Sequence, residues 1–203
     1  MTYLFAHAPR VAGLLGQHLV LVGVALAVAL AIAVPLGVLA TRNARAGAVI
    51  LAITGTIYTI PSLALLALLV AAIGLGPLTA IIALVAYAQM ILVRGVIAGL
   101  RGVDAALVEA ARGLGLTARQ TLLRVEFPAA LPVILGGVRV ATVSLVALAT
   151  VAAWINAGGL GVLLFEGISS DNPDKIVAGA LAAAALAIAA DLLLRGAERA
   201  ART

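Results

Sequence analysis

Long stretches of the chain contain no charged residue. Charge is absent from residues 11–41, 46–93, 140–165 and 176–190. A helix needs about 20 apolar residues to cross a bilayer, and the longest stretch is long enough for two crossings. The four stretches predict five membrane-spanning helices, over residues 15–40, 47–73, 78–98, 133–153 and 176–194. Pro35 is expected to kink the first of them, and the glycine- and proline-containing stretch 74–77 predicts a turn between the second and third.

The composition supports the same interpretation. Hydrophobic residues make up 65% of the 203 residues and charged residues 10%, whereas a soluble domain has about 45–50% apolar and about 25% charged residues. A soluble protein of this size could not bury so much apolar surface. The predicted fold class is therefore an all-α integral membrane protein, with a single transmembrane domain over residues 1–203 and about five transmembrane helices.

The basic residues predict the orientation of the chain in the membrane. Ten arginines lie within residues 42–45, 94–130 and 195–203, whereas Arg10 and Lys175 lie in segments on the opposite side. Arg and Lys mark cytoplasmic loops, so we expect the N-terminus outside and the C-terminus in the cytoplasm. The arginines are scattered between spans without interleaved aromatic side chains, which argues against nucleic-acid binding.

Two charged residues fall close to the apolar spans. Arg139 lies just inside the fourth span, and Asp191 lies near the inner end of the fifth. A long arginine side chain near the end of a span can reach the polar interface. We therefore expect Arg139 to extend to the membrane surface.

Residues 99–131 are predicted to form a cytoplasmic helix, a turn and a second helix. Asp104 is placed to cap the first helix, and Gly113 and Gly115 are expected to end it because glycine permits positive φ. Thr117 and Gln120 have the spacing of a capping box for the second helix.

The second of these helices is expected to end at Pro128. Both helices are short and amphipathic, and an isolated helix of this length is marginal in water. The segment is therefore expected to pack against a partner.

The order of residues in this segment resembles the EAA loop of ABC importer permeases. That pattern is Glu-Ala-Ala, three residues, Gly, nine residues, an aliphatic residue, one residue, and then usually Leu-Pro. The matching residues are Glu109, Ala110, Ala111, Gly115, Val125, Phe127 and Pro128. Valine and phenylalanine replace the commoner isoleucine and leucine and remain apolar. In that family the loop is the coupling helix that docks into a cytoplasmic ATPase, so the resemblance implies this role for these residues and Gly113.

Residues 60–66 and 158–161 resemble the osmoprotectant branch of these permeases, which imports glycine betaine, choline and carnitine. The resemblance covers roughly residues 50–170. It implies a multi-pass protein of the bacterial inner (plasma) membrane. Methionine-importer permeases share the size and the loop and remain an alternative.

The resemblance also implies which partners the chain has. It contains no Gly-Lys-Ser/Thr phosphate-binding loop, so ATP and Mg are expected on a separate cytoplasmic ABC ATPase subunit, with no cofactor, metal or enzyme activity in this chain. Five helices are too few to enclose an aqueous path, which predicts a second permease subunit, identical or homologous. An extracytoplasmic substrate-binding protein and the lipid bilayer complete the expected partners. An ion-coupled secondary transporter is the other alternative, but it would carry more intramembrane acidic groups.

A polar cluster around Pro61 is the candidate substrate path. Tyr58, Thr59 and Ser62 either satisfy backbone groups freed by a proline kink or line a pore. Gln89 in the third span is either a pore residue or a helix–helix hydrogen bond.

Aromatic residues limit how tightly this chain can select its substrate. Quaternary ammonium groups are held by aromatic cages, and only Tyr58 and Tyr87 lie in mid-membrane. Tight selection is therefore expected to belong to the binding protein, with this chain offering a permissive path.

Overall fold

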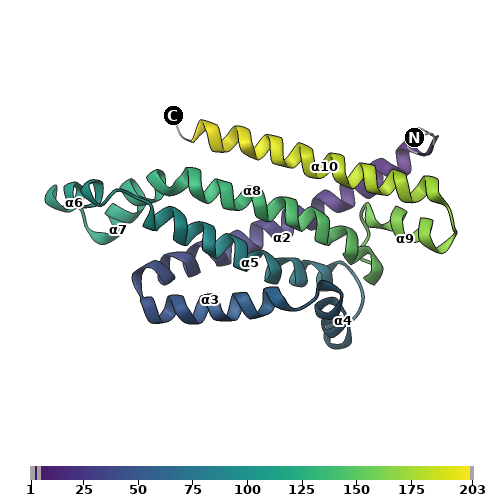
Figure 1. Ribbon diagram of the computed structural model, residues 1–203, viewed down its shortest axis with the longest axis horizontal. Coiled ribbons are helices and arrows are strands. Elements are labelled where there is room, and N and C mark those ends of the chain that lie inside the picture. The colour runs from purple at the N-terminus through teal and green to yellow at the C-terminus, as the bar shows by residue number, and fades with distance from the viewer. Residues whose placement is uncertain (1–2, 4–5, 202–203) are drawn as a thin grey trace.

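The computed structural model describes Tyr3 and residues 6–201, so Arg202, one of the ten arginines counted above, lies outside the described residues. Every regular element in the described part of the chain is a helix, which confirms the predicted fold class. The elements are α2 (Ala8–Arg42), α3 (Ala44–Thr59), α4 (Ser62–Ile73), α5 (Pro77–Arg101), α6 (Ala105–Gly113), α7 (Ala118–Thr121), the π-helical segment η1 (Leu122–Glu126), α8 (Phe127–Ala152), the 3-10 turn η2 (Ala153–Ile155), α9 (Gly161–Ser169) and α10 (Pro173–Ala200), arranged as in Figure 1.

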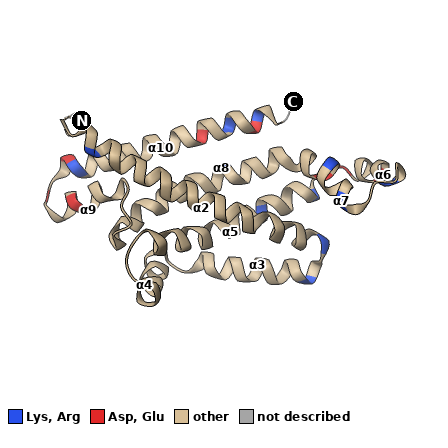
Figure 2. Cartoon of the chain, turned by 180° about the vertical axis from the view of Figure 1, so that it is seen from behind, with Lys and Arg blue, Asp and Glu red and all other residues tan. Residues whose placement is uncertain are grey.

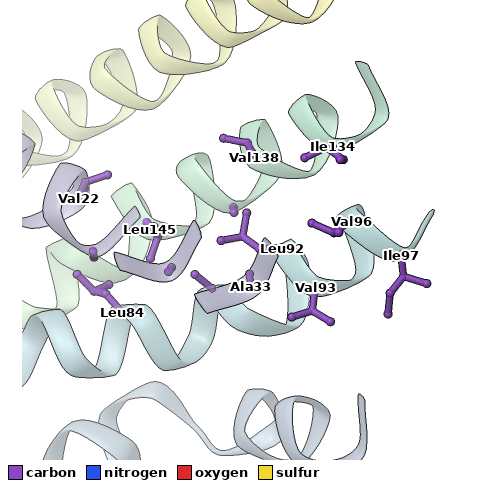
Figure 3. Packing of buried hydrophobic residues seen from close by; sticks show 14 of the residues in the cluster. Val22, Ala33, Leu84, Leu92, Val93, Val96, Ile97, Ile134, Val138 and Leu145 are labelled. Atoms are coloured by element: carbon purple, nitrogen blue, oxygen red, sulfur yellow. The ribbon is translucent and has the colours of Figure 1, made fainter. Parts of the chain in front are cut away.

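The core lies where α5 packs against α2 on one side and α8 on the other. Ala25, Ala29 and Ala33 of α2 are fully buried, and small side chains at such positions let neighbouring helices approach closely. Leu92 of α5 and Leu145 of α8 extend the same cluster (Figure 3). Helices α2, α5 and α8 therefore form the packed centre of the bundle.

The predicted span 47–73 is not one straight helix. It consists of α3 and α4, which meet at a bend of 96°. Ile60 is extended, with φ −66° and ψ 129°, because the pyrrolidine ring of Pro61 disfavours helical backbone in the residue before it. Within the described residues, four helical stretches are long and apolar enough to cross a membrane by themselves, and the total is five if this bent pair counts as one span.

Helix α2 is continuous through Pro35, and the kink expected there remains a prediction. The prediction that Pro128 ends the second cytoplasmic helix is wrong. Instead α7, η1 and α8 form one continuous helical stretch. Proline lacks the backbone N–H that a helix interior uses, and this helical stretch accommodates Pro128 with a π turn directly before it.

Arg139 is paired with two carboxylates of α10, and its expected reach to the membrane surface remains a prediction. Its Nε lies 3.3 Å from Asp191 Oδ1, and its Nη1 lies 3.5 Å from Glu198 Oε2. Arg195 Nη2 lies 3.8 Å from the other oxygen of Asp191. Charge burial beside lipid is costly, so opposite charges on α10 compensate Arg139 on α8 and join the two helices.

Replacing Arg139 with leucine should destabilise the protein by about 2 kcal/mol, between the values for exposed and fully buried ion pairs. The change leaves Asp191 and Glu198 without this cation beside the membrane. The matched control is Arg195→Leu, whose weaker contact should be worth less than about 1 kcal/mol. Thermal unfolding in detergent measures both, and equal losses would show that the Arg139 contacts are not special.

The two ends of the molecule differ in charge (Figure 2). The end that carries α6, α7 and the junction between α2 and α3 holds Arg42 and Arg45. At the opposite end, beside α9, Glu166 pairs with Arg10 at 2.5 Å and with Lys175 at 3.6 Å. The arginines that were grouped along the sequence therefore gather towards one end of the helical bundle.

Candidate functional site

Residues 105–126 form a hairpin of α6, α7 and η1 that projects from one end of the bundle (Figure 1). Asp104 caps α6, since its side chain accepts a hydrogen bond from the Ala106 N–H at 2.9 Å. This hydrogen bond confirms the predicted N-cap. We call residues 105–126 the hairpin segment.

The end of α6 depends on Gly115. Its φ is +80°, its N–H donates to the Arg112 carbonyl at 2.9 Å, and the next N–H, of Leu116, donates to the Ala111 carbonyl at 3.1 Å. This is a Schellman end, which needs a left-handed residue at that position. Gly113 is simply the last residue of α6, so its predicted helix-breaking role falls to Gly115.

The predicted capping box begins α7. The Gln120 N–H donates to Thr117 Oγ1 at 3.3 Å, and the Thr117 N–H donates to Gln120 Oε1 at 2.8 Å. Both orphan donors at this helix start are thereby satisfied. The turn between the two helices is thus fixed on both sides.

The residues of the Glu-Ala-Ala pattern differ in how far they are buried. Glu109 and Ala110 are exposed, whereas Ala111 is buried. Val125 and Phe127 are partly buried, Phe127 against the main core, and Pro128 is exposed. The structure therefore leaves Glu109 and Ala110 free to meet another protein, while the pattern's apolar members hold the segment to the bundle.

Sequence reasoning missed an apolar surface on the hairpin segment. Leu107, Leu114 and Leu123 are 51%, 81% and 55% exposed. Each of these leucines leaves apolar surface of the hairpin segment uncovered by the rest of the described chain. The amphipathic pattern of residues 105–123 carried this signal, because these leucines fall outside the apolar face that packs on the bundle.

A second missed feature lies beneath α6. Glu126 of η1 is buried, and Arg42 at the end of α2 donates a hydrogen bond to its carboxylate. Both residues line a cavity of about 260 Å³, together with Glu109 and Arg112. The sequence offered no direct signal, since the partners are 84 positions apart.

The polar cluster around Pro61 lines a cavity of about 450 Å³ between α3, α4, α5 and α8. The Tyr58 and Tyr87 rings meet edge to face with centroids 6.0 Å apart. Tyr87 donates a hydrogen bond to the Ile60 carbonyl, which the break at Pro61 leaves outside a helix. The predicted residues Tyr58, Thr59, Pro61 and Ser62 all line this cavity, and α8 adds Ser144, which was not predicted.

Gln89 does not line this cavity. It is 7% exposed, and its side-chain amide donates to the carbonyls of Ala29 and Val85, each at 3.2 Å. The structure thus places Gln89 between α5 and α2. Of the two roles considered for it, the observed contacts are those of a helix–helix hydrogen bond.

The end opposite the hairpin segment is closed by a glycine turn packed on α2. His18 Nδ1 accepts the Leu160 N–H at 3.2 Å, and its other ring nitrogen lies 3.1 Å from the Val146 carbonyl. Gln17 Oε1 accepts the Gly159 N–H at 3.0 Å. Gly158 and Gly159 form this turn with positive φ angles of 83° and 82°, and the buried His18 has a structural role.

The described chain is a bundle of membrane-length helices with a cavity beside Pro61 and a hairpin that projects from one end, an arrangement that suits a membrane transport protein. Residues 33–203 match the family described as "Binding-protein-dependent transport system inner membrane component". The chain belongs to this family, and it is a multi-pass inner-membrane permease.

Individual relatives agree with this assignment. The chain is 39% identical over 178 residues to the carnitine transport permease protein OpuCB of Listeria monocytogenes, covering 88% of this chain and 82% of the relative. It is 41% identical over 197 residues to the osmoprotectant import permease protein OsmW of Salmonella typhimurium, covering 95% and 92%. Its fold matches a chain of the inward-facing MetNI methionine ABC transporter with a TM-score of 0.87 at 22% identity, covering 95% and 96%.

Proposed function

We propose that this chain is the permease subunit of an ATP-driven importer for quaternary-ammonium osmoprotectants, such as glycine betaine, choline or carnitine. The observation that carries the proposal is identity of 35–41% over most of the chain to permeases named for carnitine, choline and osmoprotectants. The likeness to the methionine transporter is one of fold and supports no substrate assignment.

The hairpin segment is the proposed contact with a cytoplasmic ATPase, which would hold ATP and Mg. Glu109, Ala110 and Gly115 are exposed on it, and Leu107, Leu114 and Leu123 supply apolar contact area. This assignment places the arginine-rich end in the cytoplasm, in agreement with the charge rule for membrane loops. The N-terminus is then extracytoplasmic, on the side where a substrate-binding protein would deliver its ligand.

The cavity beside Pro61 is the proposed substrate path. None of its lining residues is charged, so a cation or zwitterion would meet aromatic faces, hydroxyl groups and aliphatic side chains. Two aromatic rings form part of a cage, which suits weak binding during passage. A second permease subunit would close the path, because the cavity lies at the side of a single bundle.

Co-purification tests the assembly. The tagged chain is extracted from its native membrane in mild detergent, and its partners are identified by mass spectrometry. Recovery of a nucleotide-binding ATPase and an extracytoplasmic binding protein is the expected result. A second permease sequence in the sample indicates a heterodimer, and its absence indicates a homodimer. A stable folded chain that never brings an ATPase, even after chemical cross-linking in the membrane, contradicts the proposal.

Replacing Tyr58 with alanine should lower the uptake rate of choline about fivefold, because an aromatic ring beside a quaternary ammonium group contributes roughly 1 kcal/mol. Tyr58→Phe keeps the ring and should retain most of the uptake. Initial rates in membrane vesicles measure the effect. If the alanine and phenylalanine variants are equally impaired, the ring does not contact the transported cation.

A further inference from the structure

Helix α2 has little packing contact with the hairpin segment in the described part of the chain. Helix α6 packs mainly on α7 and η1, and η1 continues directly into α8. A displacement of α6 therefore reaches α8 through a continuous helical backbone. Helix α2 packs instead on α5, α3 and α8, so a direct response to the same displacement needs another connection.

The Arg42–Glu126 ion pair is that connection. Arg42 is the last residue of α2, and Glu126 is the last residue of the π-helical segment η1. The Glu126 side chain is 6% exposed and the Arg42 side chain 45%. A buried carboxylate strongly favours keeping its cationic partner, so α2 is held to the hairpin segment by a contact that is costly to break.

The surroundings of the pair allow movement. Both members of the pair line the cavity of about 260 Å³ beneath α6, together with Glu109 and Arg112. The carboxylate also sits in a π turn, a local distortion that is frequent at functional sites. The hairpin segment thus has open space on the side that faces the spans, and the Arg42–Glu126 ion pair crosses to α2 there.

We propose that the Arg42–Glu126 ion pair transmits movement of the hairpin segment to α2, and so couples ATP hydrolysis to substrate passage. The inference rests on the proposed function, because it requires an ATPase bound to the hairpin segment. Arg42 and Glu126 are positioning residues: neither touches substrate nor nucleotide. Without the pair, α2 follows the hairpin segment only through its packing on α8 and its other neighbours.

The test compares transport with hydrolysis in the complex purified with its ATPase and binding protein and reconstituted into vesicles. Glu126→Gln removes the ionic contact without leaving a buried charge, so the variant should fold. We expect it to keep hydrolysing ATP but to import roughly tenfold less choline per ATP, within the range of known coupling effects. Arg42→Gln should give the same uncoupling, and Arg42→Lys, which keeps the charge, should restore most of the ratio.

The matched control is Glu166→Gln, which breaks the Arg10–Glu166 pair at the other end of the bundle. It should leave the ratio of choline to ATP unchanged. A purely structural role for Arg42 and Glu126 would lower hydrolysis and import together, at a constant ratio. That result in Glu126→Gln and Arg42→Gln overturns the inference alone. Absence of ATP-driven import by the unmodified complex instead overturns the proposed function.

Discussion

Replacing Gly115 with arginine is expected to abolish ATP-driven uptake while the chain still inserts into the membrane. Gly115 has a φ of +80°, where a residue with a Cβ costs about 1–2 kcal/mol. The substitution therefore distorts the Schellman end of α6, and it adds a long cation to the surface proposed to contact the ATPase. Uptake by whole cells, with membrane content measured by immunoblot, checks this prediction.

Alanine variants separate the two contributions. A Cβ would meet nothing within 4 Å at either Gly113 or Gly115, but only Gly115 has positive φ. Gly113→Ala should therefore be tolerated or slightly stabilising, whereas Gly115→Ala should impair uptake. Uptake at the rate of the unmodified protein by both alanine variants and by Gly115→Arg would show that neither the turn nor its surface takes part in coupling.

Replacing Gly161 with alanine is expected to destabilise the end of the bundle opposite the hairpin segment. A Cβ on Gly161 would lie 1.9 Å from the Thr150 carbonyl oxygen and 2.8 Å from the Ala153 Cβ. The backbone of α8 or α9 must shift to relieve this overlap, at about 3 kcal/mol. The same shift disturbs the turn that His18 and Gln17 hold through Leu160 and Gly159.

Thermal unfolding and the yield of monodisperse protein in detergent measure this loss. Gly23→Ala in α2 is the matched control, because a Cβ there meets nothing within 4 Å and alanine is the better helix former. The control should be as stable as the unmodified protein or more so. A Gly161→Ala variant with unchanged stability would mean that the close approach of α8 and α9 is not required.

The sequence predicted the helices and the local ends of the hairpin segment. Charge-free runs located the apolar segments, because the cost of a charge in lipid is high enough to leave a pattern in the sequence. Asp104, Gly115 and the Thr117–Gln120 pair act on residues within a turn of themselves, so their roles could be read from spacing. Interactions of this short range depend little on the rest of the fold.

The prolines show where this local reasoning fails. Pro35 lies within a continuous helix, Pro61 separates two helices that meet at 96°, and Pro128 follows a π turn. All three lie in or beside apolar segments that look alike in sequence. Their outcomes depend on neighbouring groups, such as the Tyr87 hydroxyl that caps the Ile60 carbonyl, and these groups come from distant parts of the chain.

The ionic contacts could not be predicted for the same reason. Arg139 pairs with residues of α10, and Arg42 pairs with Glu126 across 84 positions. Sequence showed that these charges are close to the membrane, but not which ones meet. The cavity beside Pro61 was partly predicted, since its α3 and α4 residues are adjacent in sequence, whereas Ser144 from α8 was missed.

The central claim is that this permease passes its substrate only when a partner hydrolyses ATP. The most direct test is uptake of glycine betaine, choline and carnitine by vesicles that contain the purified complex, with ATP, with a proton or sodium gradient, or with neither. We expect uptake of at least one of these solutes with ATP alone, and no stimulation by either gradient. Uptake driven by an ion gradient in the absence of ATP would contradict the account.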